Sequence, residues 1–189
     1  MALRSRVPRP RVAAVFGGSF NPPHVAHQMV CLYVLETAPV DVVWMIPCWR
    51  HPFHKPLAPF DDRLAMCRLA AAPFGDRVAV DDVERTLGGE ASRTLDTLRA
   101  LRARHPDTDL RLVIGSDVLG ETDKWYRWEE VAALAPPLVV PRGGYAGGFA
   151  LPAVSSTEVR ARIAAGGDGL PLVSRQIAAY IRQHGLYRS

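Results

Sequence analysis

The stretch from residue 11 to residue 38 constrains the fold most, because it joins a short apolar run, a glycine turn and a segment of helix length. The run at residues 11–16 contains β-branched side chains and leads into Gly17-Gly18, which is typical of a buried strand in a parallel sheet. Pro22-Pro23 suits the start of a helix, and no further helix breaker occurs at residues 24–38. The segment therefore predicts a strand, a tight turn and a helix, in that order.

Two histidines lie where this helix is expected to begin. His24 and His27 are three positions apart and would share one face of the helix. The amide N–H groups and the macrodipole at a helix N-terminus favour anions, by roughly 0.3–1 kcal/mol and by up to about 2 kcal/mol when partly buried. Two imidazoles at this position predict a site that handles phosphate.

The rest of the chain alternates strand patterns with helix patterns. This alternation predicts an α/β fold, a Rossmann-like doubly wound sheet, mainly parallel, with about five strands and flanking helices. Residues 1–10 are expected to form a flexible tail, and residues 11–189 a single domain. Ligands of such sheets bind at the carboxyl ends of the strands, near the switch point. The expected strands are 11–16, 40–46, 78–83, 110–114 and 138–140, and the expected helices are 24–38, 61–72 with Asp61 as cap, 94–104, 128–134, 155–165 and 174–184, the last ended by Gly185.

Composition narrows the class of protein. A chain of 189 residues with 48% hydrophobic content can bury a full core as one domain. No apolar run approaches the ~20 residues of a membrane span, and the basic first ten residues lack an apolar signal region, so we expect a cytoplasmic protein without a membrane partner. The net charge of +4 favours anionic ligands, but the basic residues are scattered, and we expect phosphorylated small molecules rather than nucleic acid. Whether the chain forms a homo-oligomer stays open.

The sequence contains neither of two common phosphate-binding fingerprints. Gly-x-Gly-x-x-Gly and Gly-x-x-x-x-Gly-Lys-[Ser/Thr] are both missing, which argues against redox dinucleotide binding and against a Walker-type nucleotidase. The three cysteines, Cys31, Cys48 and Cys67, show no Cys-x-x-Cys spacing and are expected to be reduced structural thiols. A Rossmann-like core of this kind is compatible with a transferase.

The motif His24-Val25-Ala26-His27 resembles the (His/Thr)-x-Gly-His signature of a nucleotidyltransferase superfamily, with Ala26 in place of the usual glycine. Later landmarks are similar to those of the bacterial nicotinate-mononucleotide adenylyltransferases within that superfamily, over nearly the whole chain. The resemblance implies catalytic roles for His24 and His27 and an ATP site that includes the turn after the first strand. The turn residues concerned are Gly17, Gly18, Ser19 and Phe20.

Two landmarks concern phosphate and the acceptor. The segment 52–55, Pro-Phe-His-Lys, resembles the family's loop after the second strand, which gives Lys55 a catalytic role toward phosphate; a solvated loop lysine is the alternative. The segment Ser92-Arg93-Thr94 resembles the family's Ser-Tyr-Thr, which helps to hold the nicotinate ring. Arg93 replaces the aromatic residue and could meet a pyridine carboxylate. Ser92 or Thr94 could instead cap a helix.

Three further landmarks complete the resemblance. Gly115 and Asp117 match the family's Gly-x-Asp-x-Leu at a strand end that meets the nucleotide, although a plain turn aspartate would look alike. Trp125 corresponds to an aromatic residue that stacks on the pyridine ring. The segment 154–160 resembles the family's Ile-Ser-Ser-Thr-x-Ile-Arg, in which a helix start and an arginine face the β- and γ-phosphates of ATP. These residues are Ser155, Ser156, Thr157 and Arg160, and an ordinary capping box is the alternative.

The resemblance implies a reaction and leaves alternatives. The implied reaction transfers adenylate from ATP, with Mg²⁺, to nicotinate mononucleotide, and releases pyrophosphate. Nicotinamide mononucleotide or another phosphate such as phosphopantetheine could be the acceptor instead, and Ala26 leaves room for a nucleotide sensor without turnover. The pairs His24/His27 and His51/His54 could also bind a transition metal, although no resident metal is expected.

Overall fold

The computed structural model describes residues 10–50, 55–89, 92–141 and 150–188. Five strands form one sheet in the order β3-β2-β1-β4-β5, and every neighbouring pair is parallel. The chain reverses its direction of travel across the sheet between β1 and β4, which is the switch point of a doubly wound fold. This confirms the predicted fold class. The strands are β1 (Val12–Gly18), β2 (Val42–Pro47), β3 (Val78–Val80), β4 (Asp109–Gly115) and β5 (Pro137–Val140).

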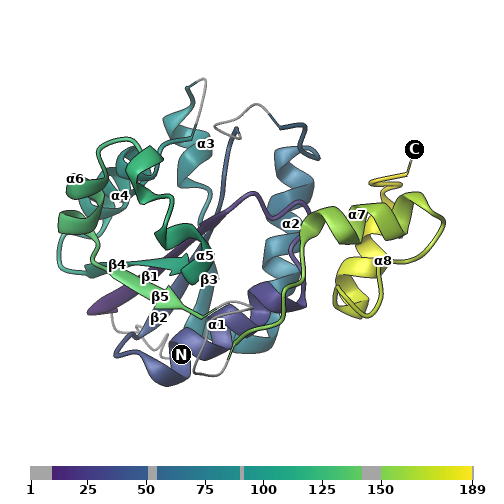
Figure 1. The fold of residues 1–189 in the computed structure, drawn as a ribbon, viewed down its shortest axis with the longest axis horizontal. Helices are drawn as coiled ribbons and strands as arrows, with labels where there is room; N and C mark the ends of the chain where they lie inside the picture. The colour runs from purple at the N-terminus through teal and green to yellow at the C-terminus, as the bar shows by residue number, and fades with distance from the viewer. Residues whose placement is uncertain (1–9, 51–54, 90–91, 142–149, 189) are drawn as a thin grey trace, which may run out of the picture.

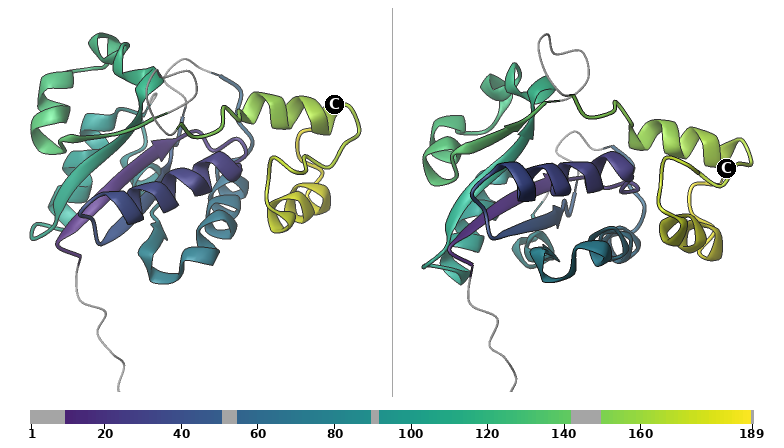
Figure 2. Two further views of the ribbon diagram at one scale, coloured as in Figure 1. Left: turned by 60° about the horizontal axis from the view of Figure 1, so that its bottom comes forward. Right: turned by 90° about the horizontal axis from the view of Figure 1, so that it is seen from below.

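Helices cover both faces of the sheet (Figures 1 and 2). Successive side chains of a strand point to opposite faces, and β1 shows this directly: Ala14 belongs to one buried cluster, whereas Ala13 and Val15 belong to the other. The first cluster is packed by α1 (Val25–Thr37), α2 (Phe60–Ala71), α7 (Ser156–Ala164) and α8 (Arg175–Gln183), and the second by α3 (Val83–Leu87), α4 (Thr94–Arg104) and α6 (Trp128–Leu134). The remaining short helices are α5 (Ser116–Leu119) and two 3₁₀ turns at Ala72–Arg77 and Thr122–Lys124.

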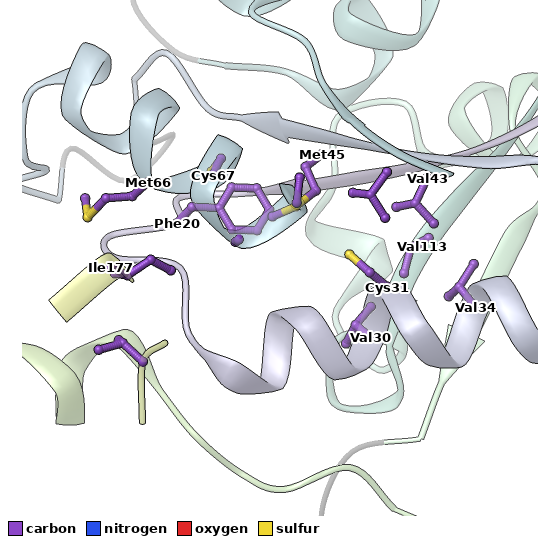
Figure 3. Close-up of a cluster of buried hydrophobic side chains, with 14 of the residues drawn as sticks. Phe20, Val30, Cys31, Val34, Val43, Met45, Met66, Cys67, Val113 and Ile177 are labelled. Atoms are coloured by element: carbon purple, nitrogen blue, oxygen red, sulfur yellow. The ribbon is translucent and has the colours of Figure 1, made fainter. Parts of the chain in front are cut away.

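The first cluster connects the sheet with the C-terminal helices. Figure 3 shows Phe20 between Met45 of β2 and Met66 of α2, with Ile177 of α8 nearby. Helices α7 and α8 project beyond the edge of the sheet (Figure 2), and Tyr180 of α8 donates a hydrogen bond of 2.9 Å to Asp62 of α2. The C-terminal segment is thereby fixed to the same layer as α1 and α2.

Most element boundaries agree with the sequence prediction within two residues, but two details were wrong. The strand expected at residues 78–83 ends at Val80, because the Asp81 carboxylate accepts the Val83 amide at 2.7 Å and turns the chain into α3. The helix expected to be capped by Asp61 begins at Phe60 after Pro59, so Asp61 lies inside its first turn. A carboxylate at that position interacts favourably with the positive end of the helix dipole. Helix α8 ends as predicted, with Gly185 at φ 62° directly after its C-cap.

Within the described residues no helix is long and apolar enough to cross a membrane. The tail expected at residues 1–10 lies almost entirely outside the described residues, and so does most of the glycine-rich link at 142–149.

Candidate active site

Two cavities open at the carboxyl ends of the strands, on the two sides of β1. We call the first the histidine cavity; it has a volume of about 240 Å³ and is lined by residues that include His24, Ala26, His27 and Gly115. We call the second the serine cavity; it has a volume of about 210 Å³ and is lined by residues that include Ser19, Ser92 and Thr94. The two cavities share four lining residues, so they meet at the end of β1. The shared residues are Gly17, Gly18, Val113 and Trp125.

The two histidines are arranged by the first turn of α1. His24 is the N-cap residue, and its backbone N–H donates to Nδ1 of His27 at 3.0 Å. The imidazole rings stack with centroids 3.6 Å apart. Because Nδ1 of His27 accepts a hydrogen bond, the neutral ring carries its proton on Nε2. The helix start thus sets the tautomer of His27, and Nε2 becomes its donor atom.

Phe20 supports His27 from the core side. Its backbone is in the left-handed region, with φ 45°, and its side chain is only 1% exposed. The ring packs edge-on against His27, with centroids 4.9 Å apart, and against Phe16 at 5.4 Å. A Cβ atom at Gly18 would lie 3.1 Å from the Phe20 ring, whereas a Cβ atom at Gly17 would meet no atom within 4 Å. Gly18 is therefore needed for packing, and Gly17 leaves open space toward the cavities.

The start of α7 is joined to the loop between β1 and α1. Ser155 caps the helix, since its hydroxyl accepts the Glu158 amide at 3.1 Å. Ser156 donates to the carbonyl of Pro22 at 2.9 Å, and Arg160 donates to the carbonyl of Asn21 at 2.8 Å. Arg160 also donates to Thr157 Oγ1 at 3.3 Å. These bonds bring a second helix N-terminus and a half-buried arginine beside the histidine motif.

Asn21 is a buried residue to which the sequence analysis gave no role. Its side-chain oxygen accepts hydrogen bonds of 3.0 Å from the Ala58 amide and from the Tyr187 hydroxyl, and its amide nitrogen donates to Pro56 at 3.3 Å. Burial raises the pKa of Tyr187, so its hydroxyl remains a proton donor throughout the neutral range. Asn21 thereby joins the β1–α1 loop to the β2–α2 loop and to the C-terminal segment. Only its place beside the glycine turn could have drawn attention to it.

The residues expected at the acceptor divide between two places. Ser92 and Thr94 line the serine cavity, and Ser92 pairs with the β2–α2 loop through two bonds of 3.2 Å to the backbone of Arg50. Arg93 is exposed and lines a more open cavity of about 700 Å³ instead, with its guanidinium 4.5 Å from the centroid of the Tyr126 ring. Trp125 lies between the histidine and serine cavities.

Three other expected site residues lie at or after the carboxyl ends of β4 and β2. Gly115 ends β4 and lines the histidine cavity. Asp117 is exposed in the first turn of α5, and Lys55 is exposed just after residues 51–54, which the structure does not describe. Neither side chain lines the histidine or the serine cavity. His51 and His54 lie outside the described residues, and the described part contains no group of three metal-binding side chains.

Known proteins with related sequences match this chain over nearly its whole length. Residues 15–162 match the family described as cytidylyltransferase-like. The "Probable nicotinate-nucleotide adenylyltransferase" of Anaeromyxobacter sp. (strain K) is 49% identical over 182 residues, covering 94% of this chain and 97% of the relative. A protein of the same name from Myxococcus xanthus is 42% identical over 184 residues, covering 95% of this chain and 96% of the relative.

Among solved structures, nicotinic acid mononucleotide adenylyltransferase of Plasmodium falciparum, complexed with NaAD, aligns with a TM-score of 0.78. It is 20% identical, with 94% of this chain and 97% of that chain covered, and the likeness concerns the fold. The sequence relatives reach much higher identity over nearly full length. The chain belongs to the cytidylyltransferase-like family and, within it, to the nicotinate-nucleotide adenylyltransferases.

Proposed function

We propose that this chain transfers the adenylyl group of ATP to nicotinate mononucleotide, forming nicotinate adenine dinucleotide and pyrophosphate in NAD biosynthesis. The observation that carries the proposal is the junction of two cavities at Gly17-Gly18, with two histidines on one side and Ser92 and Thr94 on the other. Such a junction suits two substrates that must meet end to end. A cytoplasmic enzyme with a single domain over residues 11–189 fits this role.

The reaction needs no protein nucleophile. The acceptor's 5′-phosphate is already ionised and attacks the α-phosphorus of ATP in line, and the bond from that phosphorus to the bridging oxygen breaks to release pyrophosphate. Catalysis then consists of positioning and charge stabilisation. His27, through Nε2–H, and His24 donate to phosphate oxygens as charge develops on them. The adenylate lies in the histidine cavity, against the backbone of Gly17 and Gly18, whose turn continues into Ser19 and Phe20. On its other side it meets the end of β4 at Gly115, which Asp117 of α5 follows.

The leaving pyrophosphate is stabilised by the start of α7. Ser155, Ser156 and Thr157 present a helix N-terminus, and Arg160 adds a permanent positive charge one turn later. The hydrogen bonds from Ser156 and Arg160 to the β1–α1 loop hold this group beside the histidines. Lys55, on an exposed loop, reaches the phosphates once both substrates are bound.

The acceptor's pyridine ring lies in the serine cavity. Trp125 stacks on the ring, an interaction worth about 0.5–1.5 kcal/mol beyond area burial. Ser92 and Thr94 bind the ring's carboxylate with backbone and hydroxyl donors. Arg93, which lies outside this cavity, adds positive potential at its mouth and favours an acid over an amide.

Mg²⁺ accompanies ATP in this proposal. The donor set fits this role, because Mg²⁺ commonly keeps several waters and is held by one or two carboxylates together with substrate phosphates. Asp117, next to the β4 end, is the carboxylate suited to contact one of its waters. When bound, the ion neutralises part of the charge of the triphosphate.

Label tracking tests the reaction type. ATP labelled at the α-phosphate, supplied with Mg²⁺ and nicotinate mononucleotide, should pass its label to the dinucleotide, and ATP labelled at the γ-phosphate should yield labelled pyrophosphate in equal amount. Label in inorganic phosphate or ADP would contradict adenylyl transfer. Binding of both substrates without any label transfer would favour a nucleotide sensor.

A further inference from the structure

Arg63, in the first turn of α2, is a buried cation whose partners are backbone carbonyls. The residue is 1% exposed. Its Nη1 donates to the carbonyls of Ser19 at 2.9 Å and Cys48 at 2.8 Å, and its Nε donates to Ala58 at 3.0 Å. Among the described residues, no carboxylate forms a direct ion pair with it. A charge removed from water in this way needs compensation from elsewhere in the fold.

Glu84, in the first turn of α3, is a buried anion close to the same place. It is 8% exposed, and its Oε2 accepts the Trp49 amide at 2.8 Å. Its Oε1 accepts the Thr97 hydroxyl of α4, also at 2.8 Å. Glu84 is among the residues that line the serine cavity and the larger cavity beside it. Glu84 thus binds the loop after β2 and the start of α4 at once.

The two charges contact opposite ends of one peptide group. The carbonyl of Cys48, which accepts from Arg63, and the amide of Trp49, which donates to Glu84, belong to the same peptide bond. The negative end of that peptide dipole faces the cation, and its positive end faces the anion. Charge-assisted hydrogen bonds of this kind are stronger than neutral ones, and bonds in series polarise one another.

We infer that Arg63 and Glu84 form a buried ion pair bridged by the Cys48–Trp49 peptide, and that this bridge positions the acceptor side of the site. Arg63 fixes Ser19 and Cys48, which line the serine cavity. Glu84 fixes the segment that continues to Arg50, whose backbone pairs with Ser92. Both residues are positioning residues, because they act on the cavity through the backbone that they hold.

The inference rests on the proposed function for its kinetic consequences. The bridge holds the serine cavity, whereas the groups proposed for the triphosphate are held by other bonds, from α7 to the β1–α1 loop. Weakening the bridge should therefore impair use of the acceptor more than use of ATP. A displacement of about 1 Å at a reacting group can reduce the rate about 100-fold.

The experiment is a double-mutant cycle with Arg63→Met and Glu84→Gln. We expect each single variant to lower kcat/KM for nicotinate mononucleotide by about 10- to 100-fold, with the acceptor's KM raised and the KM of ATP within about twofold of wild type. The double variant should resemble the worse single variant, because once one charge is removed the other no longer helps to hold the Cys48–Trp49 peptide. The conservative variant Glu84→Asp should recover part of the loss, since the charge remains.

The exposed pair Arg77 and Glu36, whose side chains lie 2.9 Å apart away from the cavities, provides a matched control. Arg77→Met and Glu36→Gln should leave both KM values unchanged. Losses that multiply in the double Arg63/Glu84 variant, or equal increases in the KM of ATP and of the acceptor, would overturn the inference.

A cycle of unfolding equilibria on the same variants needs no substrate and separates this inference from the proposed function. If the effects of the two substitutions on the unfolding equilibrium are coupled but the protein does not use nicotinate mononucleotide, the bridge is supported and the proposed function is refuted. Independent unfolding constants would refute the bridge. If Arg63→Met does not fold, Arg63→Lys takes its place in both cycles.

Discussion

The substitution Gly18→Ala tests how the glycine turn supports the histidines. The added methyl would lie 3.1 Å from Cζ of Phe20, closer than ordinary contact. The Phe20 ring cannot move away easily, because it is 1% exposed and packs against Phe16 and His27. The clash should therefore be passed to His27, whose Nε2 we assign to phosphate.

The magnitude follows from two opposing effects. Overpacking a closed site typically costs about 1–3 kcal/mol, and replacing a strand glycine by alanine returns about 0.5–1 kcal/mol of backbone entropy. The middles of the two ranges leave a net loss of about 1.25 kcal/mol, which lowers the Tm of a domain of this size by about 2.5–5 °C. Gly17→Ala is the matched control, because its methyl would meet no atom within 4 Å; its Tm should stay at or slightly above that of wild type.

Thermal unfolding and steady-state turnover together decide the outcome. Gly18→Ala should lose both stability and kcat, whereas Gly17→Ala should keep stability and raise the KM of nicotinate mononucleotide, since its methyl, on the same face of β1 as Val15, enters the serine cavity. The double variant Gly18→Ala/Phe20→Leu should be less destabilised than the sum of the two single changes. A Gly18→Ala protein as stable and as active as wild type would contradict the prediction, because Phe20 would then have room to move.

Three further predictions concern His27, the start of α7 and the buried thiol of Cys31. His27→Ala should lower kcat about 10²- to 10³-fold, by analogy with lost oxyanion donors, with little change in Tm; a near-wild-type rate would end its assignment. Ser156→Ala, which removes the bond to the carbonyl of Pro22, should raise the KM of ATP, whereas Ser155→Ala should chiefly lower stability, by about 0.5–2 kcal/mol as for a lost N-cap; the reverse pattern would contradict their roles. Burial raises the pKa of the Cys31 thiol from 9.0 to about 12. The folded state therefore holds the thiol proton more tightly than the unfolded chain does. The contribution of this proton to the free energy of unfolding is complete below pH 9 and is lost as the pH rises toward 12. Denaturant titrations from pH 8 to pH 11 should show falling stability, less steeply in Cys31→Ala, and equal slopes would contradict the prediction.

The sequence predicted the sheet and the long helices because their signals are local. Apolar runs, the glycine turn and the prolines define β1 and α1 within one segment. Helix α3 was not predicted, since it is short and begins where the Asp81 side chain turns the chain. The same limit applies to Asn21 and Glu84, whose partners lie 35 or more positions away or on other elements.

The candidate site shows the same division. His24, His27 and the residues that line the two cavities follow short motifs, and the fold brings them to one edge of the sheet. Arg93 stands within such a motif, but its side chain is exposed over Tyr126, because its place as N-cap of α4 directs it out of the serine cavity. A motif fixes the backbone position of a residue, whereas the direction of a long side chain depends on its neighbours in space.

We expect the serine cavity to select nicotinate mononucleotide as acceptor. The most direct measurement compares kcat/KM for pyrophosphate release with ATP and Mg²⁺ when nicotinate mononucleotide, nicotinamide mononucleotide or phosphopantetheine is the acceptor. We predict a clear preference for nicotinate mononucleotide, and replacing Trp125 by alanine should reduce its preference over phosphopantetheine, which has no pyridine ring to stack. Equal use of the amide, or release only with phosphopantetheine, would contradict the account.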